Sequence, residues 1–402
     1  MAEAAIPFER DVVIVGGCGH VGLPLGIALA HRGLRTLVYD INESSVHECN
    51  EGRLPFDEPG ADEIFEEVVS NGQLRATTDP RSVADAEFVI VVIGTPVDKH
   101  LNPDPGAIVD SLKDCFPHLR DGQLVVLRST VYPGVTRQVE SFVQRLGKDI
   151  DVAFCPERIA EGRAMVELFE LPQIISARRP AARKRAEALF RVLTDKIVHL
   201  EPEEAELAKL FTNTWRYIKF ATANQLFMIA NDFDLDFERI RSALTEDYPR
   251  AADMPGPGFA AGPCLFKDTM QLAAFNDNNF LLGHAAMLVN EGLPLYLVSR
   301  LEARYDLADL TVGILGMAFK AESDDVRSSL SYKLKRILQF KANEVLCADP
   351  YVRTDADLVD EAKLLEQAQV IIIGAPHHRY AQLETQADIV DVWGVTGRGV
   401  RV

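Results

Sequence analysis

Short apolar runs rich in β-branched residues alternate with segments of helical periodicity through the first half of the chain. Residues 11–15 (DVVIV) precede a glycine-rich turn, the helical pattern LPLGIALAHRG and a second apolar run, LRTLVYD, which ends in Asp40. This order of strand, turn, helix and strand predicts a βαβ unit. Further apolar runs at 88–93, 123–127 and 151–154 extend the alternation, which predicts a parallel sheet covered on both faces.

The pattern changes between about residues 203 and 246. EEAELAKLFTNTWRYIKFATANQLFMIAND contains no glycine or proline and repeats its apolar residues at helical spacing, so we expect a long helix. A second long helix is expected at about 266–303. Long helices between two domains often form a dimer surface, and we therefore expect a homodimer that pairs through the central helix.

From residue 310 the α/β pattern returns and repeats the first half. VIIIGAP (370–376) matches VIVVIGTP (89–96) as a buried strand that ends in Gly-x-Pro, and TVGILG matches VVIVGG. We predict an α/β fold in which two Rossmann-like, doubly wound parallel-sheet domains are joined by a long central helical region. The predicted parts are residues 1–200, 201–305 and 306–402.

Composition narrows the class of protein. The 402 residues are 47% hydrophobic and 25% charged, as in ordinary globular proteins, and the formal charge of −18 argues against nucleic-acid binding. The N-terminus does not resemble a signal peptide and no run of about 18 apolar residues occurs, so we expect a cytoplasmic protein without membrane contact. The six cysteines are scattered without a CxxC pair, which indicates reduced thiols, and no metal site is expected.

The turn after the first predicted strand matches the dinucleotide fingerprint G-x-G-x-x-G. Its members are Gly17, Cys18, Gly19, His20, Val21 and Gly22. The glycines allow a tight turn, close approach of a pyrophosphate and close packing of helix on strand. Asp40 would bind the ribose diol and repel a 2′-phosphate, which favours NAD over NADP. The alternative is a glycine turn that serves packing only.

A single cysteine stands in the segment GPGFAAGPCLFKD (256–268). Pro263 can occupy the first position of a helix, which would place Cys264 in the first turn, where the helix N-terminus lowers the pKa of a thiol. Lys267 and Asp268 follow three and four residues later, on the same face. This predicts a thiolate near a cation and a carboxylate; the alternative is a buried cysteine followed by two surface charges.

Other polar residues stand at sites where chemistry is possible. Lys209 and Asn213 are one turn apart on the predicted long helix and could present an ammonium and an amide to one oxygen. Glu157 and Glu161 in CPERIAEG are also spaced by one turn, and RSTVYPG supplies Thr130 at a strand end. The alternatives are a solvated lysine, an acidic helix start and a helix cap.

In the second half, the turn after the first strand lacks the spacing of a dinucleotide fingerprint. Lys320 and Arg327 lie just beyond that strand. Two cations at a strand end suit a nucleotide diphosphate, and they equally suit a solvated surface loop.

Together these segments resemble the nucleotide-sugar 6-dehydrogenases of the UDP-glucose/GDP-mannose dehydrogenase family, with most likeness to the UDP-glucose branch. The matching segments cover essentially the whole chain: GCGHVGLPLG, NEGRLPFDEPG, VIGTP, RSTVYPG, CPERIAEG, KLFTN, CLFKD and GMAFKAESDDVRSS. The resemblance implies oxidation of the C6 hydroxyl of a nucleotide-linked hexose to a carboxylate, with two NAD+ and no release of the aldehyde.

The resemblance also implies residue roles. Cys264 would be the nucleophile that forms a thiohemiacetal and then a thioester. Implied catalytic partners are Lys209 and Asn213 for the oxyanion, Asp268 for proton transfer, and Glu157 and Thr130 for thioester hydrolysis. Implied cofactor contacts beyond the fingerprint and Asp40 are Thr95, Thr130, Glu161, Lys267 and Arg327. Implied substrate contacts are Glu157, Arg158, Lys209, Asn213, Arg250, Phe259, Gly262 and Lys320.

The chain departs from the family pattern beside the cysteine. FAAGP (259–263) stands where many UDP-glucose enzymes have Gly-Phe-Gly-Gly, and Arg250 matches the family's partner-subunit arginine only approximately. Lys267-Asp268 favours a glucose- or mannose-type sugar over an N-acetylhexosamine. UDP-glucose or another NDP-glucose is therefore the first expectation. The alternatives are GDP-mannose, a UDP-N-acetylhexosamine, a two-electron β-hydroxyacid-type dehydrogenase and a non-catalytic sensor of NAD or nucleotide sugar.

Overall fold

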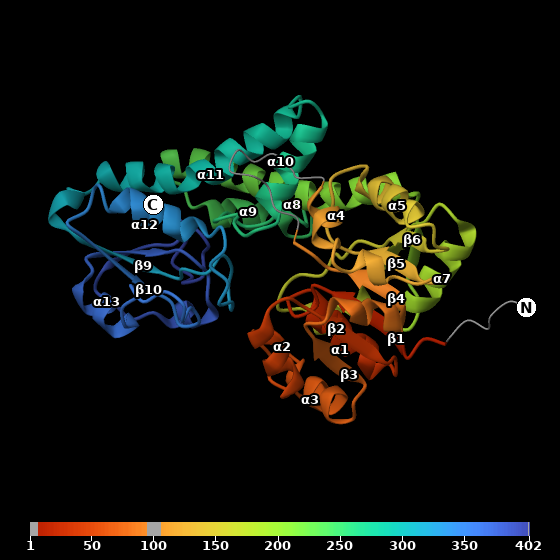
Figure 1. Cartoon of the computed structure of the whole chain (residues 1–402). Helices are drawn as coiled ribbons and strands as arrows, with labels where there is room; N and C mark the ends of the chain where they lie inside the picture. Colours follow the sequence, from red (N-terminus) through yellow and green to blue (C-terminus); the bar gives the residue numbers. More distant parts are fainter. Residues whose placement is uncertain (1–6, 95–105, 401) are drawn as a thin grey trace, which may run out of the picture. The chain divides into compact units, whose positions relative to one another are not determined.

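The computed structural model describes residues 7–94, 106–400 and 402. The chain divides into two compact units, Met1–Phe211 and Thr212–Val402 (Figure 1). Each unit has its own parallel sheet and its own hydrophobic core.

The first unit is built on a six-stranded parallel sheet with the order β3-β2-β1-β4-β5-β6. The strands are β1 (Arg10–Val15), β2 (Thr36–Tyr39), β3 (Leu74–Thr77), β4 (Ala86–Val91), β5 (Leu124–Leu127) and β6 (Asp151–Phe154). The chain direction across the sheet reverses between β1 and β4, and in such sheets ligands bind at the carboxyl ends of the strands beside this point. The predicted doubly wound sheet is confirmed.

Side chains alternate between the two faces of this sheet. Val12 and Ile14 of β1 pack on one face with α1 (Gly22–His31), α6 (Ala164–Glu170) and α7 (Pro180–Phe190). Val13 and Val15 pack on the other with α4 (Ala107–Ser111), α5 (Val135–Arg145) and the 3-10 helices η1 (Pro80–Asp85) and η2 (Phe116–His118). Also present are α2 (Glu43–Asn50), α3 (Asp62–Ser70) and an unpredicted two-stranded sheet of β7 (Gln173–Ile175) and β8 (Ile197–His199).

The predicted long helix is confirmed as α8 (Pro202–Asp232), and it is followed by α9 (Phe237–Thr245). The expected single helix at 266–303 is wrong, because the structure has α10 (Leu265–Phe275) and α11 (Leu281–Glu302). Asp277 and Asn278 take left-handed φ angles of 50° and 58° between them, a conformation that ends a helix and that Asp and Asn tolerate well.

The second unit carries a four-stranded parallel sheet with the order β10-β9-β11-β12. Its elements are η3 (Leu307–Asp309), β9 (Thr311–Leu315), α12 (Leu330–Leu338), β10 (Glu344–Ala348), α13 (Glu361–Gln367), β11 (Val370–Ile373), η4 (His378–Gln382) and β12 (Asp388–Val390). This order repeats β2-β1-β4-β5 of the first unit, which confirms the internal repeat. Helices α11 and α12 cover one face and α13 the other.

Among the described residues, α11 is long and apolar enough to cross a membrane. Buried core helices pass the same test, and Leu293, Leu297 and Leu301 of α11 lie in the core of the second unit. We therefore assign α11 to that core.

Gly258 fixes the chain that leads to Cys264. Its φ is +145°, and a Cβ there would lie 2.3 Å from a ring carbon of Trp393. Its N–H donates to Oδ1 of Asn224 on α8 at 2.8 Å, and Nδ2 of the same fully buried asparagine donates to its carbonyl oxygen at 3.0 Å. The position therefore requires glycine.

We expect Gly258→Ala to lower the free energy of unfolding by about 1–3 kcal/mol, because the methyl group must displace the Trp393 ring. Chemical denaturation would measure the loss. Gly256→Ala is the matched control, since no atom of the described residues lies within 4 Å of a Cβ at Gly256. Equal stability of the two variants would contradict the packing argument.

Candidate functional site

The glycine loop after β1 has the geometry that a dinucleotide requires. A Cβ on Gly17 would lie 2.8 Å from the carbonyl oxygen of Ile14, and one on Gly22 would lie 2.6 Å from Cα of Gly17. At Gly19 no atom of the described residues lies within 4 Å of a Cβ. The outer glycines are thus needed for packing, and the middle one leaves its backbone open to a pyrophosphate.

Asp40 lies directly after β2 and is held beside this loop. Its Oδ2 accepts the N–H of Cys18 at 3.0 Å, and its Oδ1 accepts the N–H of Asn42 at 3.0 Å. A carboxylate fixed at this point can accept hydrogen bonds from a ribose diol and repels a 2′-phosphate, so the residues present fit NAD.

His20 and Glu161, two predicted cofactor residues far apart in the sequence, come together. Nδ1 of His20 lies 3.5 Å from Oε1 of Glu161, and the His20 ring packs on Phe56 with centroids 4.1 Å apart. Phe56 belongs to the segment NEGRLPFDEPG, from which sequence reasoning singled out no residue. Its position beside the glycine loop became visible only in the fold.

Glu157 and Glu161 do not share a helix, so the prediction from their spacing is wrong. Residues 155–160 form a loop, and α6 begins only at Ala164. Oε1 of Glu157 accepts the N–H groups of Arg158 at 2.7 Å and Ile159 at 3.1 Å, which bends the chain around its own carboxylate. The carboxylate of Glu58 then caps α6 by accepting the N–H of Ala164 at 2.7 Å.

Arg128 is a buried cation that the sequence analysis missed, although it begins the motif RSTVYPG. It is 1% exposed, and its guanidinium donates to Oε2 of Glu157, to Oε1 of Gln173 and to the carbonyl oxygen of Cys155. The guanidinium also lies 4.5 Å from the centroid of the Phe190 ring. It therefore fixes the Glu157 carboxylate, which is itself buried.

The loop after β5 carries Thr130 at the carboxyl edge of the sheet. The hydroxyl of Ser129 accepts the N–H of Ile93 at 2.7 Å, which ties the start of this loop to the end of β4. Thr95, another predicted cofactor residue, lies outside the described residues. Arg158, a predicted substrate residue, donates to the carbonyl oxygen of Pro172. Burial lowers the pKa of its guanidinium.

Cys264 is the N-cap residue of α10, in the second unit. The prediction that Pro263 opens the helix is wrong by two positions, because Gly262 turns the chain with a φ of +99° and the helix begins at Leu265. The carbonyl oxygen of Cys264 accepts the N–H of Asp268 at 2.9 Å, as the first bond of the helix. The thiol therefore stands at the helix start.

Asn213 and Asp268, 55 residues apart in sequence, form a buried pair. Nδ2 of Asn213 donates to Oδ2 of Asp268 at 2.6 Å, and Nζ of Lys267 lies 3.7 Å from Oδ1 of the same carboxylate. Asp268 is 0% exposed. Lys209 precedes Asn213 by one turn of α8. The structure thus brings together two of the residues predicted to be catalytic within the unit that carries Cys264.

The segment before the cysteine contacts the loop that carries Lys320. The N–H of Gly262 donates to the carbonyl oxygen of Ser328 at 3.4 Å, and a Cβ on Gly262 would lie 2.7 Å from the ring of Phe319. Nζ of Lys320 lies 5.5 Å from the centroid of that ring. Two predicted substrate residues, Gly262 and Lys320, therefore meet at Phe319.

The remaining predicted residues of this unit differ in exposure. Phe259 is buried and packs edge-to-face on Trp393, with centroids 6.3 Å apart. Arg250 is exposed, and its Nη1 lies 3.3 Å from the Tyr248 hydroxyl. Arg327 forms an ion pair with the aspartate two residues before it.

A buried histidine anchors the Lys320 loop to the sheet. Oδ2 of Asp349 accepts the N–H groups of Met317 at 2.6 Å and Ala318 at 3.0 Å, and it lies 3.1 Å from Nε2 of His377. Nδ1 of His377 accepts the N–H of Glu322 at 2.9 Å. Burial alone would raise the pKa of Asp349, but these hydrogen bonds outweigh it and hold that pKa below its usual value.

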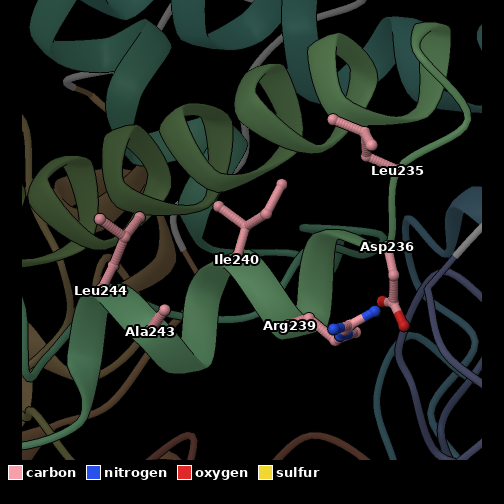
Figure 2. A pocket seen from close by; sticks show the side chains of 6 residues that line it. All are labelled: Leu235, Asp236, Arg239, Ile240, Ala243 and Leu244. Atoms are coloured by element: carbon pink, nitrogen blue, oxygen red, sulfur yellow. The ribbon is translucent and has the colours of Figure 1, made fainter.

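A pocket of about 480 Å³ lies against α9, apart from all the predicted site residues. Its lining consists of Leu235, Asp236, Arg239, Ile240, Ala243 and Leu244 (Figure 2). Leu235, Ile240 and Leu244 are 50%, 37% and 41% exposed, so the pocket opens onto an apolar surface. Within the described parts of the chain, no group of three or more His, Cys, Asp or Glu residues is placed to hold a metal ion.

The structure describes all six cysteines, and Cys264 is the exposed one. Burial raises the pKa of Cys115 to about 11 and those of Cys155 and Cys347 to about 12. The hydrogen bond from Cys49, with an Sγ–Sγ distance of 3.8 Å, and burial together raise the pKa of Cys18. Near pH 8 the thiols whose pKa is raised are therefore protonated, and all five cysteines other than Cys264 are buried.

We therefore expect iodoacetamide at pH 8 to alkylate Cys264 before any other cysteine, since alkylation requires an accessible thiolate. Peptide mass spectrometry over a time course would measure the order. Cys264→Ala should remove the rapid phase, and rapid labelling of Cys155 or Cys347 in the folded protein would contradict the expectation.

Known proteins match the chain along its length. Sequence models of the UDP-glucose/GDP-mannose dehydrogenase family match the NAD binding domain at residues 11–194, the central domain at 203–291 and the UDP binding domain at 313–398. The chain is 30% identical to the UDP-N-acetyl-D-mannosamine dehydrogenase of Yersinia pestis, over 97% of this chain and 99% of that protein. It is 29% identical to the NDP-N-acetyl-D-galactosaminuronic acid dehydrogenase of Ralstonia solanacearum, over 95% of each chain.

Among solved structures, the UDP-glucose dehydrogenase of the archaeon Pyrobaculum islandicum aligns with a TM-score of 0.90 and 27% identity, over 99% of each chain. The fold, the geometry of the glycine loop and the sequence matches along the chain all indicate the same family. The chain belongs to the UDP-glucose/GDP-mannose dehydrogenase family and is an NAD-dependent oxidoreductase of nucleotide sugars.

Proposed function

We propose that the protein oxidises the C6 hydroxyl of a nucleotide-linked hexose to a carboxylate through a thioester on Cys264. The observation that carries the proposal is the exposed Cys264 thiol at the start of α10, in the same unit as the buried Asn213–Asp268 pair. The balanced reaction converts R–CH2OH, two NAD+ and water into R–COO−, two NADH and three protons. Bound NAD+ supplies the hydride acceptor in both oxidations.

Residues of the chain would stabilise the oxyanion, transfer the proton, form the bond to sulfur and orient the hydrolytic water. Lys209 and Asn213 stabilise the developing oxyanion at C6, and Asp268 receives the hydroxyl proton through water. The Cys264 thiolate adds to the aldehyde carbon, which keeps the intermediate bound and makes the second oxidation another hydride loss. Water then cleaves the C–S bond of the thioester and restores the thiolate, with Glu157 and Thr130 orienting that water.

We propose UDP-glucose as the first candidate substrate. The C-terminal sheet matches the family's UDP binding domain, the Lys267-Asp268 pair suits a glucose-type sugar, and the Pyrobaculum islandicum relative is a UDP-glucose dehydrogenase. A UDP-linked N-acetylhexosamine is the second candidate, because the relatives from Yersinia pestis and Ralstonia solanacearum are named for such sugars. The two differ at C2, where the second carries an acetamido group.

A panel of UDP-glucose, dTDP-glucose, GDP-mannose and UDP-N-acetylhexosamines, assayed by NADH absorbance, would test this function. We expect UDP-glucose to give the highest kcat/KM and two NADH per sugar consumed. Cys264→Ala should lose the complete reaction, because no thiolate captures the aldehyde, and Cys264→Ser should turn over slowly. One NADH per sugar, or full activity of Cys264→Ala, would reject the thioester mechanism; a faster N-acetylhexosamine would reject only the first candidate substrate.

We also propose that the protein forms a homodimer through α8. Within the second unit this helix exposes the large apolar side chains of Trp215 (58%), Leu226 (38%) and Ile229 (51%), and Phe233 (74%) follows directly after its last residue, Asp232. The exposed leucines and isoleucine of the α9 pocket extend the apolar surface of this unit (Figure 2). An exposed apolar patch of this kind supports an interface between protein chains.

The double variant Ile229→Glu/Phe233→Glu should shift the protein towards the monomer, because four charged groups would be buried across a symmetric interface. Light scattering after size-exclusion chromatography would measure the mass. Phe340→Glu is the matched control, since Phe340 is 89% exposed and follows α12 rather than α8, so the variant should leave the mass unchanged. A wild-type protein that is monomeric at micromolar concentration would contradict the proposal.

A further inference from the structure

Glu206, on the second turn of α8, is a buried carboxylate that the proposed chemistry does not use. It is 1% exposed. Its Oε2 accepts the N–H of Gly134 at 2.7 Å, and its Oε1 accepts both the N–H and the hydroxyl of Thr136, at 2.8 Å and 2.6 Å. Three donors therefore converge on this one carboxylate, from residues that precede it by 70 and 72 positions in the sequence.

These donors belong to the start of α5. Gly134 is the N-cap residue with a left-handed φ of +97°, and as a glycine it has no side chain to cap the helix. The first N–H groups of a helix lack partners within it and carry partial positive charge. A carboxylate from α8 thus supplies the cap that the α5 sequence lacks, and it does so in a buried place where the bonds are little screened.

The cap joins two segments that carry proposed catalytic residues. The loop from β5 to α5 contains Thr130; its first part is tied to β4 through Ser129, and its last part is tied to α8 through Glu206. On α8, Lys209 follows Glu206 by three residues and therefore lies on the neighbouring turn of the same side. Both segments belong to the first unit.

We propose that Glu206 is a positioning residue that fixes Lys209 relative to the loop carrying Thr130. This inference rests on the proposed function, in which Lys209 stabilises the oxyanion. Glu203, on the same helix, offers a comparison that separates this positioning role from the general packing of α8 on α5. Glu203 also joins α8 to α5 through Arg137 and pairs with Arg178, but its side chain is 37% exposed and contacts neither Gly134 nor Thr136 among its hydrogen bonds.

Glu206→Gln keeps the size of the side chain but places an amide N–H against one of the backbone donors. We expect kcat to fall on the order of 10- to 100-fold, because small displacements of an oriented catalytic group have effects of that size. KM for NAD+ and for the sugar nucleotide should stay within about threefold, since Glu206 is 1% exposed and its oxygens already accept three donors from the protein. Glu203→Gln should keep kcat within about twofold.

Double variants decide whether the effect passes through Lys209. In the Lys209→Met background, Glu206→Gln should lower kcat by no more than about threefold further, because the group that it positions is already absent. Full multiplication of the two losses would overturn the proposal, and so would comparable rises of both KM values. Thr136→Val removes one donor and keeps the shape, so it serves if Glu206→Gln does not fold; it should lower kcat about 3- to 10-fold with unchanged KM.

The outcomes distinguish this inference from the proposed function. If Lys209→Met keeps the wild-type kcat, the oxyanion role of Lys209 fails, and the positioning role fails with it. If Lys209→Met keeps only a small residual kcat while Glu206→Gln and Thr136→Val match the wild type, only the positioning role fails.

Discussion

Carboxylates that accept backbone N–H groups hold the loops at the carboxyl edges of both sheets. Asp40 accepts an N–H of the glycine loop, and Glu157 accepts the N–H groups of the bend that directly follows it. Glu58 and Glu206 accept N–H groups at the starts of α6 and α5, and Asp349 accepts those of the turn after β9. A parallel sheet presents its strand ends together, but the loops beyond them need partners for their N–H groups. The chain has a formal charge of −18, and several of its acidic residues serve as hydrogen-bond acceptors within the fold.

An aspartate after the second strand of each half serves a different purpose in the two halves. Asp40 after β2 and Asp349 after β10 occupy the same place in the repeated strand order. Asp40 bonds one N–H of the glycine loop and keeps its carboxylate beside a loop that is open at Gly19. Asp349 accepts two N–H groups of the turn after β9 and two more from Tyr351 and Val352, and it also lies beside His377, so its oxygens are occupied by bonds within the protein. The repeat is therefore structural, while the ligand chemistry of the halves has diverged.

Much of this could be predicted from the sequence. Strand runs, the fingerprint with Asp40 and the unbroken α8 follow from local periodicity and glycine spacing, which act over a few residues. The break between α10 and α11 was missed because Asp277 and Asn278 are ordinary polar residues whose left-handed conformation depends on their surroundings. The Glu157 bend, Arg128 and Glu206 were missed for another reason. Their hydrogen-bond partners lie from one residue to more than 70 residues away in the sequence, and these hydrogen bonds leave no periodic pattern in it.

The contact between Gly262 and Phe319 limits which substitutions the segment before Cys264 can accept. A side chain at Gly262 would collide with the aromatic ring, and the left-handed φ of Gly262 also disfavours one. The neighbouring Ala261 is only partly buried and does not have a left-handed φ. A larger residue at position 262 therefore requires a paired change in which Phe319 is replaced by a smaller residue.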